Sequence, residues 1–290
     1  VVDTYASDPQ AVTSLLEAYW HTDPQTQQLH DEFIENTLTN FYLPFGVAPN
    51  FLIDGVSYTL PMVIEESSVV AAASKSAKYW ASRGGFHTRI IGTDKIGQVH
   101  FTRSGSPEAT QQFFDRIQPL LLQSVAPLVA NMEKRGGGIR SIELVNKTQD
   151  LPDYYQLFVR FGTADAMGAN FINSCLEQLA QTLKAEDPSL TVVMSILSNY
   201  VPDCTVRSEV CCPVKDLGGV EGMSAEAFAE KIKQAVDIAR VEPYRAVTHN
   251  KGIMNGIDAV VLATGNDFRA IEAGVHAYAA KDGRYTSLTH

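Results

Sequence analysis

The spacing of apolar residues along the chain predicts where its helices lie. Apolar side chains recur every three or four residues after Asp8-Pro9, an acidic N-cap followed by proline at the first helical position. The same spacing runs through residues 67–83 and through residues 108–134, and both runs are followed by glycines that end a helix. Residues 166–185 and 224–240 show it as well. We therefore predict amphipathic helices in these segments, each with one face toward a core.

Shorter apolar segments predict strands. Two of them lie within residues 41–64 and flank Asp54-Gly55, a dipeptide typical of a tight hairpin turn. Four more lie in the middle of the chain, at residues 97–103, 141–146, 154–161 and 190–197. Together with the two helices between them, these four strands give the order β-α-β-β-α-β.

This order predicts a ferredoxin-like small domain, because it is the order of the split β-α-β unit. The unit is complete within residues 93–200, so we predict that it is inserted into a larger domain formed by residues 1–92 and 201–290. The fold class would be α+β, with helices and strands of the larger domain arranged around a central helix. Ala71-Ala72-Ala73 indicates the helix of residues 67–83 as the central one, because small side chains let neighbouring elements approach closely.

Composition and charge argue against several classes of protein. The net charge of −10, with no run of Lys or Arg, argues against nucleic-acid binding, which requires a basic face. No apolar run approaches the ~20 residues of a membrane span, and the N-terminus shows no signal-peptide pattern. The four cysteines form no C-x-x-C pair, so we expect reduced thiols, no metal site and a cytoplasmic protein.

The segment Asp165-Ala-Met-Gly-Ala-Asn170 lies between a predicted strand and a predicted helix. We expect Asp165 to cap this helix and Gly168 to help leave its first turn uncovered. An uncovered helix N-terminus binds anions through its free N–H groups and its dipole. The segment does not contain G-x-G-x-x-G, so an ordinary capped helix is the simpler interpretation when the segment is taken alone.

Three ionisable residues have a similar double interpretation. Lys251 and Asp267 are each predicted to lie in a Gly/Asn-rich turn, and the apolar residues 259–263 join the two turns. Glycine lets a backbone approach a ligand closely. Asp267 opens the helix-like residues 268–280, and Glu66 lies at the start of the Ala-rich helix. Taken singly, Lys251 is a surface lysine, and the two acidic residues are ordinary residues of a helix start.

Taken together, these residues occur in strings that resemble the soluble, class II form of 3-hydroxy-3-methylglutaryl-coenzyme A (HMG-CoA) reductase. The resemblance runs from about Asp31 to the end of the chain. Its strings are Pro61-Met-Val-Ile-Glu-Glu-Ser-Ser68, the D-A-M-G-x-N segment from Asp165 to Asn170, Thr248-His-Asn-Lys-Gly-Ile-Met-Asn-Gly256 and Ala263-Thr-Gly-Asn-Asp267.

The resemblance implies an oxidoreductase that interconverts HMG-CoA with mevalonate and coenzyme A by two hydride transfers. The cofactor would be NADP or NAD, and the assembly a homodimer or a higher even oligomer with its active site across the interface. Lys251 would stabilise the oxyanion, Asp267 would hold Lys251, and Glu66 would supply a proton. The implied roles are catalytic for Glu66, Lys251, Asp267 and Asn255, substrate-binding for Ser68, Arg245 and Glu35, and cofactor-binding for Asp165, Met167, Gly168, Asn170 and Ser141.

Ser141 departs from the pattern of the family. In NADH-preferring members an acidic residue stands there, which accepts a hydrogen bond from the ribose 2′-OH and repels a 2′-phosphate. Serine removes that repulsion, and Arg140 or Lys147 would be available to attract the phosphate. We therefore expect NADPH to be accepted at least as well as NADH.

Two further departures concern the substrate and the end of the chain. Thr39 replaces a glycine in the E-N-x-x-G segment that begins at Glu35. Family members continue beyond the position of His290, through a mobile flap whose histidine protonates the thiolate of coenzyme A. The resemblance thus implies that the C-terminal part is missing, and a truncated or non-catalytic ligand-binding protein on the same fold is the alternative function.

Overall fold

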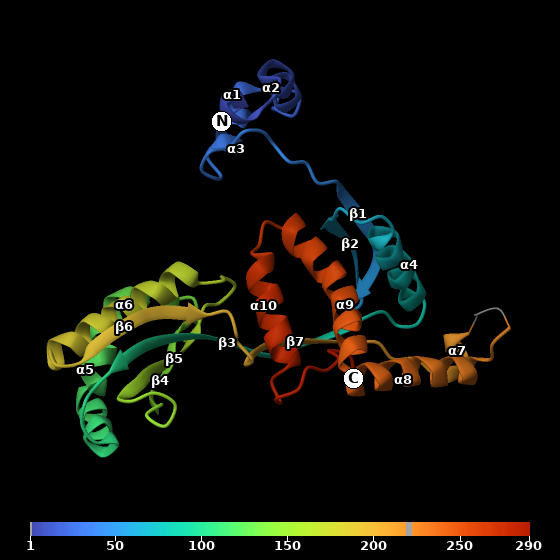
Figure 1. The fold of residues 1–290 in the computed structure, drawn as a ribbon. Coiled ribbons are helices and arrows are strands. Elements are labelled where there is room, and N and C mark those ends of the chain that lie inside the picture. Colours follow the sequence, from blue (N-terminus) through green and yellow to red (C-terminus); the bar gives the residue numbers. More distant parts are fainter. Residues whose placement is uncertain (1, 219–221) are drawn as a thin grey trace.

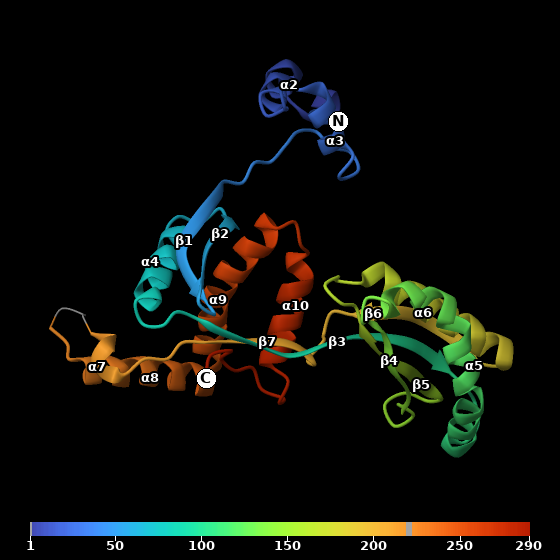
Figure 2. The ribbon, with the colours of Figure 1, turned by 180° about the vertical axis from the view of Figure 1, so that it is seen from behind.

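The computed structural model describes residues 2–218 and 222–290 (Figure 1). Asp8 caps the second helix by accepting a hydrogen bond from the Ala11 N–H, and Pro9 is its first residue, as predicted. The N-terminal helices stand away from the rest of the chain in both views (Figures 1 and 2). They are α1 (Val2–Tyr5), α2 (Pro9–Glu17) and α3 (Pro24–Asp31).

The predicted hairpin is formed by β1 (Phe45–Ile53) and β2 (Val56–Val63), which pair antiparallel. Asp54 and Gly55 make its turn with φ angles of 48° and 83°. Two positive φ angles are what a two-residue turn of type I′ requires, so the dipeptide predicted the turn correctly. The helix α4 (Val69–Ala81) contacts β1, and Ala48, Met62 and Ala259 form the small core next to them.

Four helices of the described residues follow β7 (Cys204–Glu209). They are α7 (Val214–Leu217), α8 (Ala225–Val241), α9 (Pro243–Ala263) and α10 (Phe268–Ala279). The central helix is α9, since it contacts β2, α4, α8 and α10. The prediction of a central Ala-rich helix was wrong for this chain, because Ala71 and Ala72 are exposed on α4.

The prediction that Lys251 lies in a turn was also wrong, because Lys251 lies in the middle of α9. The helix begins at Pro243 after Glu242, whose carboxylate caps it. Gly252 and Gly256 each cost a helix about 1 kcal/mol relative to alanine. Tertiary contacts along α9 offset that cost, as they do for most helices in proteins.

The last residues of the chain are tied to α9 by Asn250, which is fully buried. Its side-chain amide donates to the Thr286 carbonyl at 2.9 Å, and its side-chain oxygen accepts from the Leu288 N–H at 3.0 Å. An asparagine that bonds to the backbone of another segment does not compete with its own helix. This contact explains why an asparagine-rich string is helical here.

Replacing Asn250 with alanine removes both of these hydrogen bonds. We expect a loss of about 1–3 kcal/mol in the free energy of unfolding, because the Thr286 carbonyl and the Leu288 N–H lose their partner. Urea denaturation measures this loss. The control Asn266→Ala changes an exposed asparagine and should cost less than about 0.5 kcal/mol. Equal effects of the two substitutions would contradict the role given to Asn250.

One long strand, β3 (His87–Thr102), connects the two parts of the chain. Its first half pairs with β7 (Cys204–Glu209), and its second half pairs with β5 (Tyr154–Gly162) and β6 (Thr191–Ser198). The strand β4 (Gly138–Asn146) pairs with the other edge of β5. The strand order is β4-β5-β3-β6, and each of these neighbours is antiparallel. The chain therefore passes from one part to the other within a continuous strand rather than through a loop (Figure 1).

The helices α5 (Pro107–Glu133) and α6 (Ala169–Glu186) pack against this sheet and against each other (Figure 2). Their apolar faces and the inward side chains of the strands form the main core, which includes Val99, Phe101, Ile117, Leu157 and Leu176. The six elements predicted for the middle of the chain are present in the predicted order.

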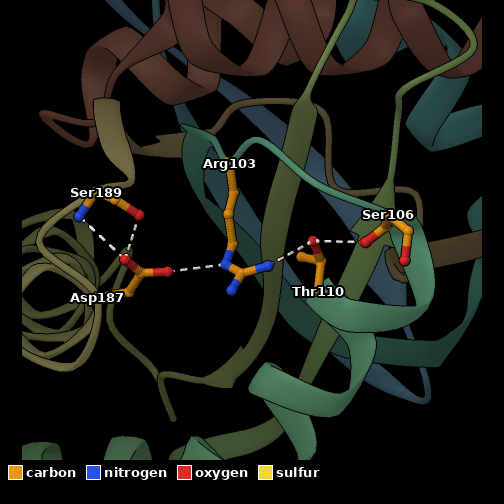
Figure 3. A network of polar contacts seen from close by, with 5 residues as sticks. All are labelled: Arg103, Ser106, Thr110, Asp187 and Ser189. Carbon is orange, nitrogen blue, oxygen red and sulfur yellow. Dashed lines mark hydrogen bonds and ion pairs between the residues drawn. The ribbon is translucent and has the colours of Figure 1, made fainter.

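A polar network ties together one end of this layered structure (Figure 3). Arg103, directly after β3, donates to the Asp187 carboxylate at 2.9 Å and to the Thr110 hydroxyl at 3.2 Å. Asp187, which ends α6, also accepts from Ser189. Hydrogen bonds from Ser189, and then from Arg103, hold the pKa of Asp187 below its ordinary value. The network fixes the end of α6 and the first turn of α5 to the end of β3.

Candidate active site

The structure brings Lys251 and Glu66 together. Lys251 Nζ, from α9, donates to Glu66 Oε2, in the segment between β2 and α4, at 3.0 Å. Their side chains are 63% and 49% exposed. An ion pair this exposed contributes only about 0–1 kcal/mol to stability, so stability does not account for it. The pair places an accessible cation beside an accessible carboxylate, which is an arrangement suited to handling a proton and a developing negative charge.

Glu66 and Ser68 line an open pocket of about 400 Å³ beside the first residues of β1. Ser68 precedes α4 with a φ of 74°, a left-handed conformation that is uncommon for a residue other than glycine. Its hydroxyl makes no capping hydrogen bond. The hydroxyl and the first N–H groups of α4 are therefore free to bind polar groups of a ligand in the pocket.

Two further predicted residues lie on α9. Asn255 follows Lys251 by one turn on the same face of the helix and is half-buried. Arg245 is exposed near the start of the helix. Burial, and after it the nearby Arg245 guanidinium, lowers the pKa of His249. The helix thus presents Arg245, Lys251 and Asn255 from one rigid element.

The predicted cofactor segment forms a tight loop between β5 and α6, and Asp165 does not cap the helix as predicted. The N-cap is Gly168, with a φ of 81°. A Cβ atom on Gly168 would lie 2.4 Å from Thr163, and the Thr163 hydroxyl donates to the Ala166 carbonyl at 2.6 Å. This loop moves the helix start to Ala169 and leaves Asp165 exposed in a turn.

The loop leaves the N-terminus of α6 without a side-chain cap. Free N–H groups and the helix dipole at such an end attract an anion. Met167 is 50% exposed and Asn170 is exposed beside this end. The residues present therefore fit the pyrophosphate of a dinucleotide.

Ser141, on β4, lies in a charged cluster. Arg160 is its cross-strand partner on β5, and Arg160 Nη1 lies 3.4 Å from Ser141 Oγ. Arg160 Nη1 also donates to the Glu143 carboxylate. Ser141 Oγ donates to Glu143 Oε1 at 3.1 Å. A serine, a carboxylate and a guanidinium thus share one patch of the sheet.

The basic residues that the sequence suggested near Ser141 are engaged elsewhere. Arg140 donates to the Gly136 carbonyl at 2.8 Å, and Lys147 donates to Asp150 at 2.8 Å. Arg160 was missed because it lies 19 residues from Ser141. The register of β4 on β5 would have indicated it, and no single sequence fixes that register.

Comparison with known proteins identifies the family. The model of the hydroxymethylglutaryl-coenzyme A reductase family matches residues 8–289. The chain belongs to this family. The 3-hydroxy-3-methylglutaryl-coenzyme A reductase of Archaeoglobus fulgidus is 39% identical over 262 residues, which cover 89% of this chain and 58% of that protein. A probable reductase of Borreliella burgdorferi is 35% identical and covers 90% of this chain and 59% of that protein. The chain thus spans less than two thirds of the length of these relatives.

Solved HMG-CoA reductase structures show the same fold. A reductase of Streptococcus pneumoniae is 37% identical with a TM-score of 0.81, and the match covers 99% of this chain and 79% of that one. The class II reductase of the same organism bound to NADPH in open conformations is 36% identical with a TM-score of 0.81 and the same coverage. The resemblance to class II HMG-CoA reductases is therefore confirmed.

Asp267 lies apart from Lys251 in this chain. Asp267 caps α10 by accepting from the N–H groups of Arg269 and Ala270 at 3.1 and 3.2 Å. The Arg269 side chain, and then the Ala270 N–H, holds the pKa of Asp267 below its ordinary value. Ala263 ends α9 12 residues after Lys251, which is roughly 18 Å along the helix. Among the described residues Lys251 pairs with Glu66 and Asp267 pairs with Arg269, so the two residues form no ion pair with each other in this structure.

Glu35 also lies apart from the pair. It is exposed in the turn that follows α3. The N-terminal segment stands away from α9 in both views (Figures 1 and 2). The structure therefore joins Glu66 to Lys251 and places Ser68 with Glu66 on one pocket. Asn255 follows Lys251 by one turn of α9, and Glu35 and Asp267 lie outside this group.

Asp258 is a residue that the sequence did not single out. It follows Lys251 by two turns on α9, and its Oδ1 atom is buried without a hydrogen-bond partner among the described residues. Burial, and then a hydrogen bond with Glu272 of α10 and the charge of that residue, raises the pKa of Asp258 to about 6. The Asp258 carboxyl thus keeps its proton at pH values where exposed aspartates have lost theirs.

This raised pKa predicts a pH dependence of stability. The unfolded chain loses the Asp258 proton near pH 4 and the folded chain near pH 6, so the folded state binds more protons between these values and stability falls as pH rises. Asp258→Asn should remove that fall and stabilise the protein at pH 7.5 by about 1 kcal/mol, a value reduced for solvent screening. Melting curves from pH 4 to pH 7.5 measure it. Asp115→Asn, an exposed residue of α5, is the control, and a wild-type pH profile in Asp258→Asn would contradict the assignment.

Metal binding and membrane insertion find no support among the described residues. Among them, no cluster of three His, Cys, Asp or Glu side chains has the geometry of a metal site. No helix in residues 2–218 or 222–290 has the length and apolar character needed to cross a membrane. All four cysteines are free, as predicted, and burial raises the pKa of Cys175 to about 11.

Proposed function

We propose that this chain is the part of an HMG-CoA reductase that carries the catalytic lysine, the substrate pocket and the dinucleotide site. The complete enzyme would interconvert HMG-CoA with mevalonate and coenzyme A, using NADPH or NADH. The observation that carries the proposal is the hydrogen bond between Lys251 and Glu66, formed between exposed side chains beside an open pocket. Membership in the family supports the choice of substrate.

Each of the site residues has a proposed task. NADPH or NADH would supply the hydride when bound, and the Lys251 ammonium would stabilise the negative charge that develops on the carbonyl oxygen of the substrate. Glu66, already hydrogen-bonded to Lys251, would supply or shuttle a proton at the aldehyde stage. The free hydroxyl of Ser68 would orient the substrate, and Arg245 would hold its carboxylate. Asn255 would complete the hydrogen-bond network one turn after Lys251.

We infer that residues 93–200 form a ferredoxin-like dinucleotide-binding domain inserted into a larger domain of residues 1–92 and 201–290. The strand order β4-β5-β3-β6 and the element order β-α-β-β-α-β support this domain. The N-terminus of α6, with Asp165, Met167, Gly168 and Asn170 around it, would hold the pyrophosphate. Ser141 would lie at the ribose 2′ position.

We also infer a homodimer, or a higher even oligomer, in which a second subunit supplies Asp267 to Lys251. The separation of these residues along one chain supports this. Gly252 and Gly256 support it as well, because a Cβ atom on either would meet open space, so another chain could approach α9 closely. Exposed Phe33, Ile34 and Phe41 in the N-terminal segment are suited to burial by a partner subunit. The free thiols agree with a cytoplasmic location.

A truncated or non-catalytic ligand-binding protein on the same fold is the alternative function. The resemblance implies a histidine that protonates the thiolate of coenzyme A. His249 bonds to Thr289 and His276 bonds to Tyr285, so both have structural partners. The accessible pair of Lys251 and Glu66 argues for catalysis, because a binding protein has no need of it.

Calorimetric titration tests the proposed sites separately. HMG-CoA and NADPH should each bind the chain, and binding of one ligand should leave a site for the other. If neither ligand binds, the proposed function is wrong. If only NADPH binds, the substrate pocket is wrong and the dinucleotide site stands.

A further inference from the structure

The cluster around Ser141 contains more charge than the sequence interpretation of that position assumed. We propose that Glu143 and Arg160 form an exchangeable ion pair that sets the choice between NADH and NADPH. The ribose 2′-OH of NADH donates to the Glu143 carboxylate, while the 2′-phosphate of NADPH takes the place of that carboxylate on Arg160. This inference rests on the proposed dinucleotide site.

The strand geometry puts both charged groups beside Ser141. Side chains two residues apart on a strand lie on the same face, so Glu143 lies next to Ser141 on β4. Ser141 Oγ donates to Glu143 Oε1 at 3.1 Å. Arg160 is paired with Ser141 across the strands, and its Nη1 atom donates to the Glu143 carboxylate. A group bound at Ser141 therefore meets a carboxylate and a guanidinium within hydrogen-bonding reach.

The balance of charge explains why the pair acts on both cofactors. Arg160 is flanked by Glu143 and, at 3.8 Å, by Asp203. Two carboxylates around one guanidinium leave no excess positive charge for a phosphate, so the phosphate must displace Glu143 before it binds Arg160. A neutral hydroxyl needs no displacement, because the carboxylate accepts its hydrogen bond directly.

A ligand is also able to separate the two side chains of this ion pair. The side chains of Arg160 and Glu143 are 31% and 52% exposed, so a ligand reaches both. The Arg160 guanidinium lies 5.0 Å from the centre of the Phe158 ring, which holds its plane when the carboxylate leaves. Glu143 thus supplies the carboxylate that is missing at position 141. Arg160 supplies the cation, because Arg140 and Lys147 are engaged elsewhere.

Substitutions that remove either the negative or the positive member of the ion pair test this exchange. Dissociation constants of NADH and NADPH are measured by calorimetry for the wild type, Glu143→Gln and Arg160→Gln, with Arg160→Lys as a milder second change at the same position. Glu143→Gln should favour NADPH over NADH by at least about tenfold relative to the wild type, because it frees Arg160. Arg160→Gln should favour NADH by a similar factor. The matched control is Glu209→Gln, which breaks the exposed ion pair with Arg207 on β7 and should leave the ratio unchanged.

The outcomes separate the inference from the function on which it rests. Opposite shifts in the two substitutions support the exchange. If every variant binds both dinucleotides with the wild-type ratio, the exchange is wrong and the dinucleotide site stands. If the wild type binds neither dinucleotide, the site itself is wrong, and the exchange with it.

Discussion

Replacing Lys251 with alanine lowers the turnover of mevaldehyde reduction at least about a hundredfold and leaves the fold intact. Turnover falls because the carbonyl oxygen loses the only cation that the described residues place beside Glu66. The fold survives because the Lys251 side chain is 63% exposed and its ion pair with Glu66 adds little stability. Initial rates of NADPH oxidation with mevaldehyde measure the first effect, and thermal melting measures the second.

The matched control for this change is Lys233→Ala. Lys233 is 68% exposed on α8 and is paired with Asp237 at 2.6 Å, so it also is an exposed helical lysine with a carboxylate partner. Its loss should leave turnover unchanged. Near-normal turnover in Lys251→Ala would show that another group stabilises the oxyanion. An equal loss in both variants would show that surface charge in general, rather than Lys251, supports the reaction.

Mixing two inactive variants restores activity if Asp267 acts on the partner subunit. Lys251→Ala lacks the cation, and Asp267→Asn keeps the cap of α10 while losing the charge. In a mixed dimer one site carries both changes and the other carries neither. Half of a random mixture is mixed dimer, so the recovered turnover should be about a quarter of the wild-type value.

The same experiment tells whether Lys251 and Asp267 act within one chain. If they did, every site in every dimer would carry one of the changes, and mixing would restore nothing. Each variant alone, at the same total concentration, is the control. Absence of recovery after subunit exchange, in variants shown to be dimers, would contradict the shared site and return Asp267 to a structural role as a helix cap.

Local signals in the sequence predicted much of the fold. The hairpin followed from Asp54-Gly55, because this dipeptide suits the two positive φ angles of its turn. The long helix α5 followed from its uninterrupted apolar spacing and the glycines after it. The order of the six central elements followed in turn, because each element carried its own periodicity.

The errors occurred where a specific contact outweighs the turn and helix preferences of single residues. The string around Lys251 contains the residues of a turn, yet it is helical because Asn250 bonds to the C-terminal segment instead of its own backbone. Asp165 precedes a helical pattern, yet the Thr163 hydroxyl organises the loop and delays the helix. The first contact reaches a segment 36 residues away, and the second depends on the exact backbone conformation of a short loop.

For the same reason, the sequence predicted only part of the candidate site. The resemblance indicated Glu66 and Lys251, which the structure joins although they lie 185 residues apart. Arg160 and Asp258 carry no motif, and their positions depend on strand register and on helix packing. Residues of this kind become visible only once the elements are placed in space.

The most direct test of an active site at Lys251 and Glu66 is mevaldehyde reduction by this chain. Mevaldehyde carries no thioester, so its reduction releases no thiolate and needs no histidine to protonate one. With NADPH and mevaldehyde, we expect NADPH oxidation and mevalonate formation to proceed in equal amounts and both to be lost in Lys251→Ala. A folded chain that binds NADPH and mevaldehyde, but forms no mevalonate, would contradict it.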